Sequence, residues 1–457
     1  MSADSNKTPA LIAATLTSFL TPFMSSAVNI ALPTIGEQFD LNAISLPWVT
    51  LSFSLAAAVF LVPFGKLADI HGRKRIFAIG TLLFTLSTFL VGIAPSAAAL
   101  IAFRAAQGVG SAMIFGTGVA ILTSVYPPGE RGQVLGINVT AVYLGLSLGP
   151  FFGGLLTQQL GWRSVFLATV PLGLAAVAYV VWGLKGEWAE ARGESFDLAG
   201  SAIYSVALIA IMLGFSRLPK LLGSGLILAG VIGIGLFAAW EMRARNPVLD
   251  VGLFSRNRVF AFSNLAALIN YSATAAVGFL LSLYLQYIKG LTPQQAGFVL
   301  IAQPVMQALF SPLAGRLSDR VEPRVVASTG MAISASGLFL LVWLSATTPL
   351  AWIVFCLILL GFGFALFSSP NMNAIMGSVE RRLYGVASGT LGTMRLVGQT
   401  FSLGVAALLF AVYIGNVQIE PQYYPQFLAA VKTAFAILTV LCVGGVFASL
   451  TRGRLRS

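Results

Sequence analysis

The sequence predicts an all-α protein that crosses a membrane fourteen times. Of its 457 residues, 57% are hydrophobic and only 9% are charged, whereas a soluble domain usually carries about 25% charged residues. The apolar residues form long runs, each near the ~20 residues that a helix needs to cross a bilayer. Short polar or charged segments separate these runs. A soluble core could not bury so much apolar surface, so the bilayer is the expected solvent.

The first six spans follow a short polar N-terminal segment. That segment shows no cleavable signal peptide, so the first apolar run is expected to stay in the membrane. Charged residues, Pro and Gly end each run, as in GRKR at 72–75 and GERG at 129–132. The expected spans are 10–32, 46–64, 76–94, 97–122, 133–157 and 164–183.

Eight more spans follow the charged segment 185–197. The first two form a pair that is separated by RLPK at 217–220. The others are again bounded by charge, Pro or Gly, as in GRLSDRVEPR at 315–324. The expected spans are 198–215, 222–240, 260–285, 297–314, 325–346, 351–372, 386–414 and 428–450. Together with the first six they make fourteen spans, and this even number places both termini on one side of the membrane.

The basic residues indicate which side that is. The net charge of +12 could suggest a nucleic-acid partner, but the Lys and Arg residues cluster between spans. With cytoplasmic termini, 20 of the 27 fall in cytoplasmic segments and 5 in outer ones, as the positive-inside rule requires. The expected partner is therefore the lipid bilayer and not nucleic acid. Both cysteines lie within apolar runs, and neither a metal site nor a cofactor is expected.

An internal repeat divides the chain. GKLADIHGRKR (65–75) matches GRLSDRVEPR (315–324), with Gly65, Leu67 and Asp69 aligned to Gly315, Leu317 and Asp319 at a constant offset of 250 residues. This pattern predicts a six-helix half at 1–185, an inserted helix pair at 186–245 and a second six-helix half at 246–457. Parallel halves of this kind are a transporter architecture with the substrate site between them, near the bilayer midplane.

Three motifs and one segment carry a family resemblance. GKLADIHGRKR resembles motif A of the major facilitator superfamily, and LIAFRAAQGVGSA (100–112) resembles motif B. GLSLGPFFGG (145–154) is similar to motif C, the antiporter motif, which places Gly145, Gly149, Pro150, Gly153 and Gly154 on one helix. The inserted pair and EMRARNPVLDVGLFSRNRVF (241–260) resemble the fourteen-helix drug:proton antiporter family. The resemblance implies the major facilitator fold, export across the cytoplasmic (inner) membrane, and no enzymatic activity.

The motif residues also have physical interpretations. Gly65 would let two helices approach closely, and Asp69 could accept backbone N–H bonds from a helix N-terminus. The resemblance makes Asp69 and Arg73 part of a conformational latch, while Arg73 could equally be a headgroup anchor. The residues of motif C allow a bend or tight helix packing.

No carboxylate lies in the middle of a predicted span. Many members of the resembled family carry an aspartate at the position of Met24, where it can bind a proton and a cationic drug alternately. This chain offers uncharged polar groups there and on the other central helices. The substrate-binding candidates are Met24, Ser25, Asn29, Gln107, Asn138, Asn264, Asn270, Gln303, Gln307, Asn371, Asn373 and Gln399.

Arg104 and Arg395 lie deep within their expected spans, 97–122 and 386–414. Each either binds an anionic group, as a coupling or substrate residue, or is a structural arginine that carbonyl groups satisfy. The predicted function is alternating-access export of small amphipathic molecules or drugs by a monomer, with proton coupling implied by the resemblance. The alternative is potential-driven or proton-independent export of neutral or anionic amphiphiles, including lipids. A non-transporting membrane sensor is a more distant alternative.

Overall fold

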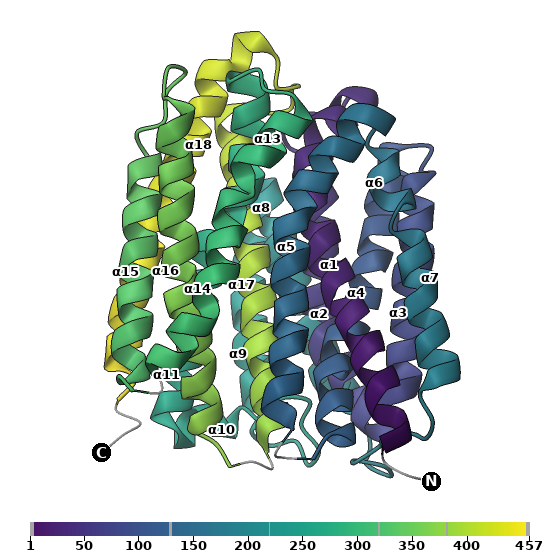
Figure 1. Ribbon diagram of the computed structural model, residues 1–457. Helices are drawn as coiled ribbons and strands as arrows, with labels where there is room; N and C mark the ends of the chain where they lie inside the picture. Colours follow the sequence, from purple (N-terminus) through teal and green to yellow (C-terminus); the bar gives the residue numbers. More distant parts are fainter. Residues whose placement is uncertain (1–3, 128–129, 219, 319, 381–382, 454–457) are drawn as a thin grey trace.

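Long helices standing side by side make up the protein, with both termini at the same end of the bundle (Figure 1). The computed structural model describes residues 4–127, 130–218, 220–318, 320–380 and 383–453, and this part of the chain contains helices and no strand. The α-helices are α1 (Asp4–Gln38), α2 (Trp48–His71), α3 (Arg73–Gly92), α4 (Ala97–Val125), α5 (Arg131–Leu160), α6 (Arg163–Leu167), α7 (Val170–Ala178), α8 (Leu198–Arg217), α9 (Leu221–Glu241), α10 (Gly252–Arg256), α11 (Arg258–Thr274), α12 (Ala276–Leu283), α13 (Pro293–Leu300), α14 (Ala302–Ser318), α15 (Pro323–Leu341), α16 (Leu350–Gly377), α17 (Tyr384–Tyr413) and α18 (Tyr424–Thr451).

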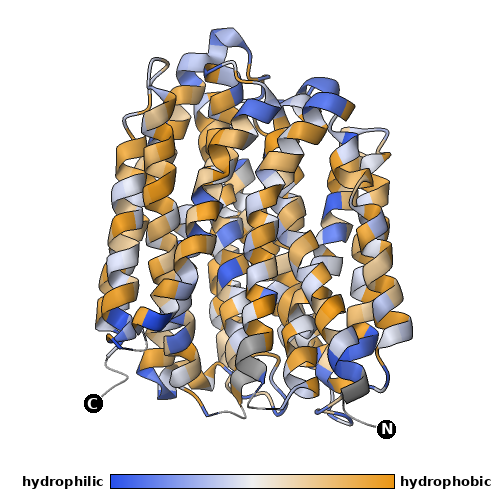
Figure 2. Ribbon diagram, viewed as in Figure 1, coloured by the Kyte–Doolittle hydropathy of each residue, from blue (hydrophilic) through white to orange (hydrophobic). Residues whose placement is uncertain are grey.

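The prediction of fourteen spans is confirmed. The described residues contain 14 helical stretches long and apolar enough to cross a membrane, in the predicted order. Figure 2 shows hydrophobic residues along most of the helices and hydrophilic ones gathered toward the two ends. The helices extend beyond the predicted runs, so that the first span covers Asn6–Gln38 instead of 10–32. Polar residues beyond the apolar run can continue the backbone hydrogen bonds of the helix, which hydropathy alone does not reveal.

Three spans are interrupted helices. The sixth contains α6 and α7, with Pro171 in the first turn of α7, where its missing N–H costs nothing. The ninth joins α11 and α12, and the tenth joins α13 and α14. Thr292 and Gln295 form a reciprocal capping box that starts α13. Pro171 thus marks the interruption of the sixth span, and the capping box marks the start of the tenth.

The repeat is also visible in the packing. In the first half, α3 and α4 meet at Gly80 and Gly110, and a Cβ on Gly110 would stand 2.8 Å from the Gly80 carbonyl oxygen. In the second half, α15 and α16 meet at Gly330 and Gly363, where the corresponding distance is 2.6 Å. Small residues allow this close approach of helices in membranes. Gly80 and Gly330 are 250 residues apart, the same offset as the sequence repeat.

The inserted pair packs against the bundle through α8. The Tyr204 hydroxyl donates to the Ala58 carbonyl of α2 at 2.9 Å, and Phe215 stacks edge-on against Phe401 of α17 at 5.4 Å between ring centroids. α8 therefore contacts a helix of each predicted half. α9 presents a more exposed apolar face, as Leu221 at 88% exposure shows. The division at 185 and 245 remains a prediction.

Candidate functional site

A polar cluster lies midway along the helices where the two predicted halves meet. The Tyr143 hydroxyl of α5 hydrogen-bonds the Ser368 hydroxyl of α16 at 3.4 Å, and the Tyr271 hydroxyl of α11 contacts the same serine. The Arg395 guanidinium of α17 stands 5.6 Å from the centre of the Tyr271 ring. Phe364 packs edge-on against that ring at 5.5 Å. Four helices thus bring one cation and several hydroxyls together, and we call Tyr143, Tyr271, Ser368 and Arg395 the central cluster.

Arg395 is the more accessible of the two predicted arginines. Its side chain is half-buried, and a planar guanidinium presents five donors for carboxylate, phosphate or carbonyl groups. The acidic residues that the structure describes lie elsewhere, since each falls outside the spans or within the last turn of one. The central cluster therefore combines a positive charge with aromatic surface.

Arg104 has different surroundings. It is fully buried, its Nε donates to the Val49 carbonyl at 3.0 Å and one terminal nitrogen donates to Gln107 Oε1 at 2.5 Å. The Gln107 amide continues to Thr88 at 2.6 Å, and the Phe53 ring centre lies 4.5 Å from the guanidinium. This network ties α4 to α2 and α3 within the first half. The arrangement favours the structural role for Arg104 and Gln107.

Several candidate side chains form hydrogen bonds with residues of their own half. Met24 is fully buried, and its sulfur accepts a hydrogen bond from Thr169 at 3.4 Å. Asn371 accepts from Arg452 at 2.8 Å and donates to the Ser263 carbonyl at 3.1 Å. Asn373 donates to Ser318 at 2.6 Å. Three others are buried in helix packing: Asn138, Asn264 and Asn270.

The other candidates are more accessible. Four are half-buried: Ser25, Asn29, Gln303 and Gln399. The remaining candidate, Gln307, is 6% exposed and thus buried like Asn138. The Asn29 backbone carbonyl accepts from Ser282 of α12 at 2.6 Å, which places this part of α1 against the second half. The four half-buried residues and Arg395 of the central cluster are therefore the more accessible of the predicted polar groups.

Arg452 is a buried arginine that sequence reasoning did not single out. It directly follows α18, is 1% exposed and also approaches Ser263 at 3.4 Å. Burial lowers the pKa of its guanidinium to about 10, so the side chain keeps its charge at neutral pH. In the sequence it looked like a loop anchor, because the apolar run ends just before it. The sequence does not single out Tyr271 and Ser368 as site residues, because tyrosine and serine are ordinary residues within spans.

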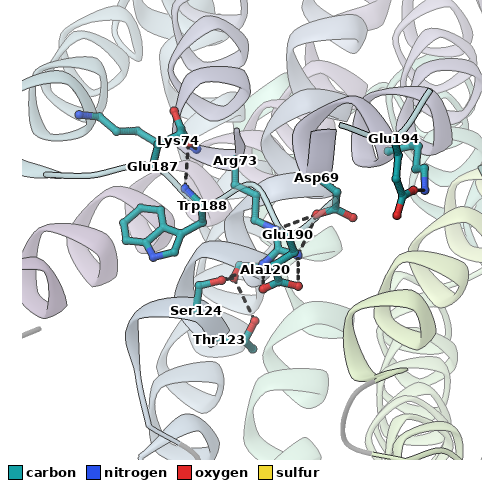
Figure 3. A network of polar contacts seen from close by, with 11 residues as sticks. Asp69, Arg73, Lys74, Ala120, Thr123, Ser124, Glu187, Trp188, Glu190 and Glu194 are labelled. Carbon is teal, nitrogen blue, oxygen red and sulfur yellow. Dashed lines mark hydrogen bonds and ion pairs between the residues drawn. The ribbon is translucent and has the colours of Figure 1, made fainter. Parts of the chain in front are cut away.

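The motif A loop is held by the segment that precedes α8 (Figure 3). Arg73, the first residue of α3, is 7% exposed and lies 2.8 Å from Asp69, in the last turn of α2. Its guanidinium donates to both carboxyl oxygens of Glu190 at 2.8 and 3.0 Å. The Ala191 amide donates to the Asp69 carbonyl at 2.9 Å, and Lys66 pairs with Glu194 at 2.6 Å. We call residues 184–194 the linker strap.

Glu187 of the strap performs the capping that was expected of Asp69. Its carboxyl oxygens accept the backbone N–H groups of Lys74 at 2.7 Å and Arg75 at 3.1 Å, in the first turn of α3. A carboxylate at a helix N-terminus is favoured by the helix dipole. Asp69 instead pairs with Arg73.

The two glycines aligned by the repeat differ in their surroundings. A Cβ on Gly65 would meet no atom within 4 Å, so packing there does not require glycine. At the matching position, a Cβ on Gly315 would lie 2.8 Å from Ser369 Oγ. Asp319, the predicted counterpart of Asp69, lies outside the described residues.

Motif C forms a junction of three helices. A Cβ on Gly149 would collide with Ser26 Oγ, and one on Gly153 would stand 2.8 Å from the Ala27 Cα of α1. On another side, a Cβ on Gly154 would lie 3.0 Å from the Gln294 Cα of α13, and one on Gly297 would collide with the Pro150 carbonyl. Gly145 packs against the Phe19 carbonyl in the same way. Motif C therefore packs α5 tightly against α1 and against the second half.

Hydrogen bonds also join the halves at the end of the bundle opposite the termini. Asn42 donates to Asn416 at 2.7 Å, and the Ala43 amide donates to the Val417 carbonyl at 2.8 Å. Gln286 of the second half donates to the Ile30 carbonyl at 3.0 Å. With the motif C junction, these contacts hold the halves together at that end.

Comparison with known proteins agrees with this architecture. The Major Facilitator Superfamily model matches residues 14–254 and 264–455. The Cephamycin export protein CmcT of Amycolatopsis lactamdurans is 32% identical over 96% of this chain and 93% of its own length. The Multidrug resistance protein Stp of Mycobacterium tuberculosis is 32% identical over 90% of this chain and 77% of its own length. The Riboflavin transporter RibZ of Clostridioides difficile is 30% identical over 85% and 84%.

Solved structures show the same fold. A bacterial homologue of the human lysosomal transporter Spinster, in an inward-facing conformation, aligns with a TM-score of 0.67 at 17% identity, covering 98% of this chain and 96% of its own. The human organic anion transporter MFSD10 aligns with a TM-score of 0.65 at 14% identity, covering 98% and 100%. The fourteen spans, the packed repeat and the whole-chain family match lead to one conclusion: this chain belongs to the major facilitator superfamily of membrane transporters.

Proposed function

We propose that this transporter exports small amphipathic molecules across the cytoplasmic membrane by alternating access between its two six-helix halves, working as a monomer. The names of its relatives, which include a multidrug resistance protein and a cephamycin export protein, support the outward direction. The antiporter-like motif C supports the same direction. The excess of basic residues in alternate segments supports cytoplasmic termini.

The central cluster carries this proposal. It lies midway along helices of the two predicted halves, and transporters of this architecture bind substrate near the bilayer midplane. Arg395 is half-buried there, and Tyr271 and Phe364 supply an aromatic surface. An amphipathic molecule with a neutral or anionic polar group fits this chemistry, because the cation and hydroxyls can hydrogen-bond the polar group while the rings bury the apolar part.

The membrane potential would assist such a substrate. An inside-negative potential is worth ~2.3 kcal/mol per charge for each 100 mV, which is roughly a 50-fold concentration ratio. It drives an anion outward without a proton, whereas a cation needs another energy source. We therefore place potential-driven or proton-independent export first among the coupling mechanisms.

Proton-coupled export is the second candidate. The resemblance of motif C to the antiporter motif favours it, and the proton would then be carried by Asp69 or another acid at a span end. The latch formed by Asp69, Arg73 and the linker strap would link protonation of such an acid to the conformational change.

A substrate panel tests the proposed function. The full chain is reconstituted in sealed vesicles, and uptake of neutral, anionic and cationic amphiphilic dyes of similar size is compared with that of protein-free vesicles. We expect transport of the neutral and anionic dyes, with the anionic dye weakened in Arg395→Gln. Transport restricted to cationic dyes would contradict the proposed substrate class, and no transport of any dye would contradict amphiphile export.

A further inference from the structure

The inserted helix pair contains the most deeply buried acidic side chain among the described residues. Glu241, the last residue of α9, is 3% exposed. Its Oε2 accepts the backbone N–H of Leu249 at 3.0 Å. Its Oε1 is buried and receives no hydrogen bond from the part of the chain that the structure describes. A buried carboxyl oxygen without a donor is costly unless it carries a proton or binds a cation.

Asp197 brings a second carboxyl group to the same place. It caps the start of α8, where its Oδ1 accepts the Gly200 N–H at 2.8 Å. Its Oδ2 accepts the indole N–H of Trp240 at 2.8 Å. A Cβ on Gly200 would collide with Glu241 Oε1 and would stand 2.6 Å from Asp197 Oδ2. The two carboxyl groups therefore share the space beside Gly200.

Among the residues that the structure describes, the charged neighbour of Glu241 is a second acid and not a base. The charged group that faces Glu241 is Asp197. α8 otherwise presents Gly200, and the segment after α9 presents the backbone N–H groups of Val248 and Leu249. Within the described ranges, neither carboxyl group forms an ion pair. Two carboxylates in contact repel each other, so one of them is expected to bind a proton.

We propose that Glu241 and Asp197 form a proton-binding site, in which Glu241 holds a proton at neutral pH and donates it from Oε1 to Asp197 Oδ2. Asp197 is the acceptor in this pair, because the Gly200 amide and the Trp240 indole both donate to its carboxyl group and hold it in place. This site lies in the inserted pair, away from the central cluster, and its existence does not depend on the proposed substrate class.

The proton-binding site lies at the start of the helix that contacts both predicted halves. Asp197 caps α8, the helix that contacts α2 through Tyr204 and α17 through Phe215. Loss of the proton would place two negative charges together at the junction of α8 and α9 and would separate the carboxyl groups. The protonation state of Glu241 is therefore expected to control how firmly α8 and α9 are joined at this end.

Infrared spectroscopy of the purified full chain tests the proposal. The protonated carboxyl C=O absorption at neutral pH is compared in wild type, Glu241→Gln and Glu420→Gln, the last removing an exposed acid at the opposite end. Glutamine at 241 can still accept from Leu249 and can donate to Asp197, so this variant is expected to fold. We expect the band in wild type and in Glu420→Gln and its loss in Glu241→Gln. Absence of the band from wild type, or an equal band in Glu241→Gln, would overturn the site.

Thermal stability gives a second readout. A proton that only the folded chain holds makes the folded state lose stability as pH rises. The melting temperature of wild type should therefore fall from mildly acidic to mildly alkaline pH more steeply than that of Glu241→Gln. Equal slopes in the two proteins would count against proton binding at Glu241, even if both fold normally.

Discussion

Two arginines that look alike in the sequence have different environments. Arg104 is enclosed by a carbonyl, an amide and an aromatic ring, whereas Arg395 is half-buried between the halves. Hydropathy places both arginines within spans, but it does not say which side of a helix faces the other half. The division into a structural and a substrate-facing arginine thus depends on tertiary packing. Met24 is similar, since its sulfur is bound to Thr169 inside one half.

Replacing Arg395 should impair transport more than folding. Arg395→Gln removes the positive charge of the central cluster, and a hydrogen bond to a charged group contributes about 1.5–3 kcal/mol. We expect uptake of an anionic amphiphile at subsaturating concentration to fall roughly 10- to 100-fold, with a smaller effect on a neutral one. Arg217→Gln, an exposed change on α8, serves as the matched control. Unchanged anionic transport in Arg395→Gln would exclude this side chain from the site.

Replacing Arg104 should impair folding. Arg104→Ala leaves a cavity and removes the partner of the buried Gln107 side chain, which costs at least ~2 kcal/mol. We expect a lower melting temperature in detergent than for wild type. If Arg104→Ala melts like wild type but transports poorly, the structural role is wrong.

At the scale of elements, the linker strap shows what a sequence can and cannot reveal. Its acids, 112 to 128 residues from their partners, contact the motif A loop. The motif is recognisable from residues 65–75, but nothing local identifies Glu187 as the cap of α3 or Glu190 as the partner of Arg73. Pairings over such distances follow from how the sixth span returns toward the second, which only the folded chain defines.

Weakening the strap should loosen the motif A loop without unfolding the protein. Glu190→Gln removes the bidentate pair with Arg73, but exposed ion pairs contribute little to global stability. We expect an unchanged melting temperature and faster hydrogen exchange at the amides of Arg73 and Ala191, which bond across this contact. Protection equal to that of wild type at both amides would show that the pair does not hold the strap.

The junction between α5 and α13 should be sensitive to side-chain size. Gly297→Leu places a side chain against the Pro150 backbone, so we expect the halves to separate at the end opposite the termini. Modification of an introduced Asn42→Cys by a membrane-impermeant thiol reagent should then increase. Gly444→Leu is the control, because its Cβ would meet no atom within 4 Å. Equal modification in both variants would contradict a closing role for this junction.

At the scale of the whole molecule, the fold could be predicted almost completely. Apolar run length, the repeat at Gly65 and Gly315 and the resemblance of the motifs correctly predicted fourteen spans and a major facilitator fold. These properties depend on the bilayer and on short motifs, both of which a sequence records. The central cluster could be predicted only in part, because Arg395 is visible as a charge while Tyr271 and Ser368 become distinctive through their position alone.

No carboxylate lies in the middle of a predicted span. We therefore expect the membrane potential, and not a pH gradient, to drive export, and this is the central claim. The direct measurement is efflux of an anionic amphiphile from sealed proteoliposomes, with an inside-negative potential and a pH gradient imposed separately. We expect the potential alone to accelerate efflux and the pH gradient alone to have little effect. Efflux that requires the pH gradient and ignores the potential would contradict potential-driven export.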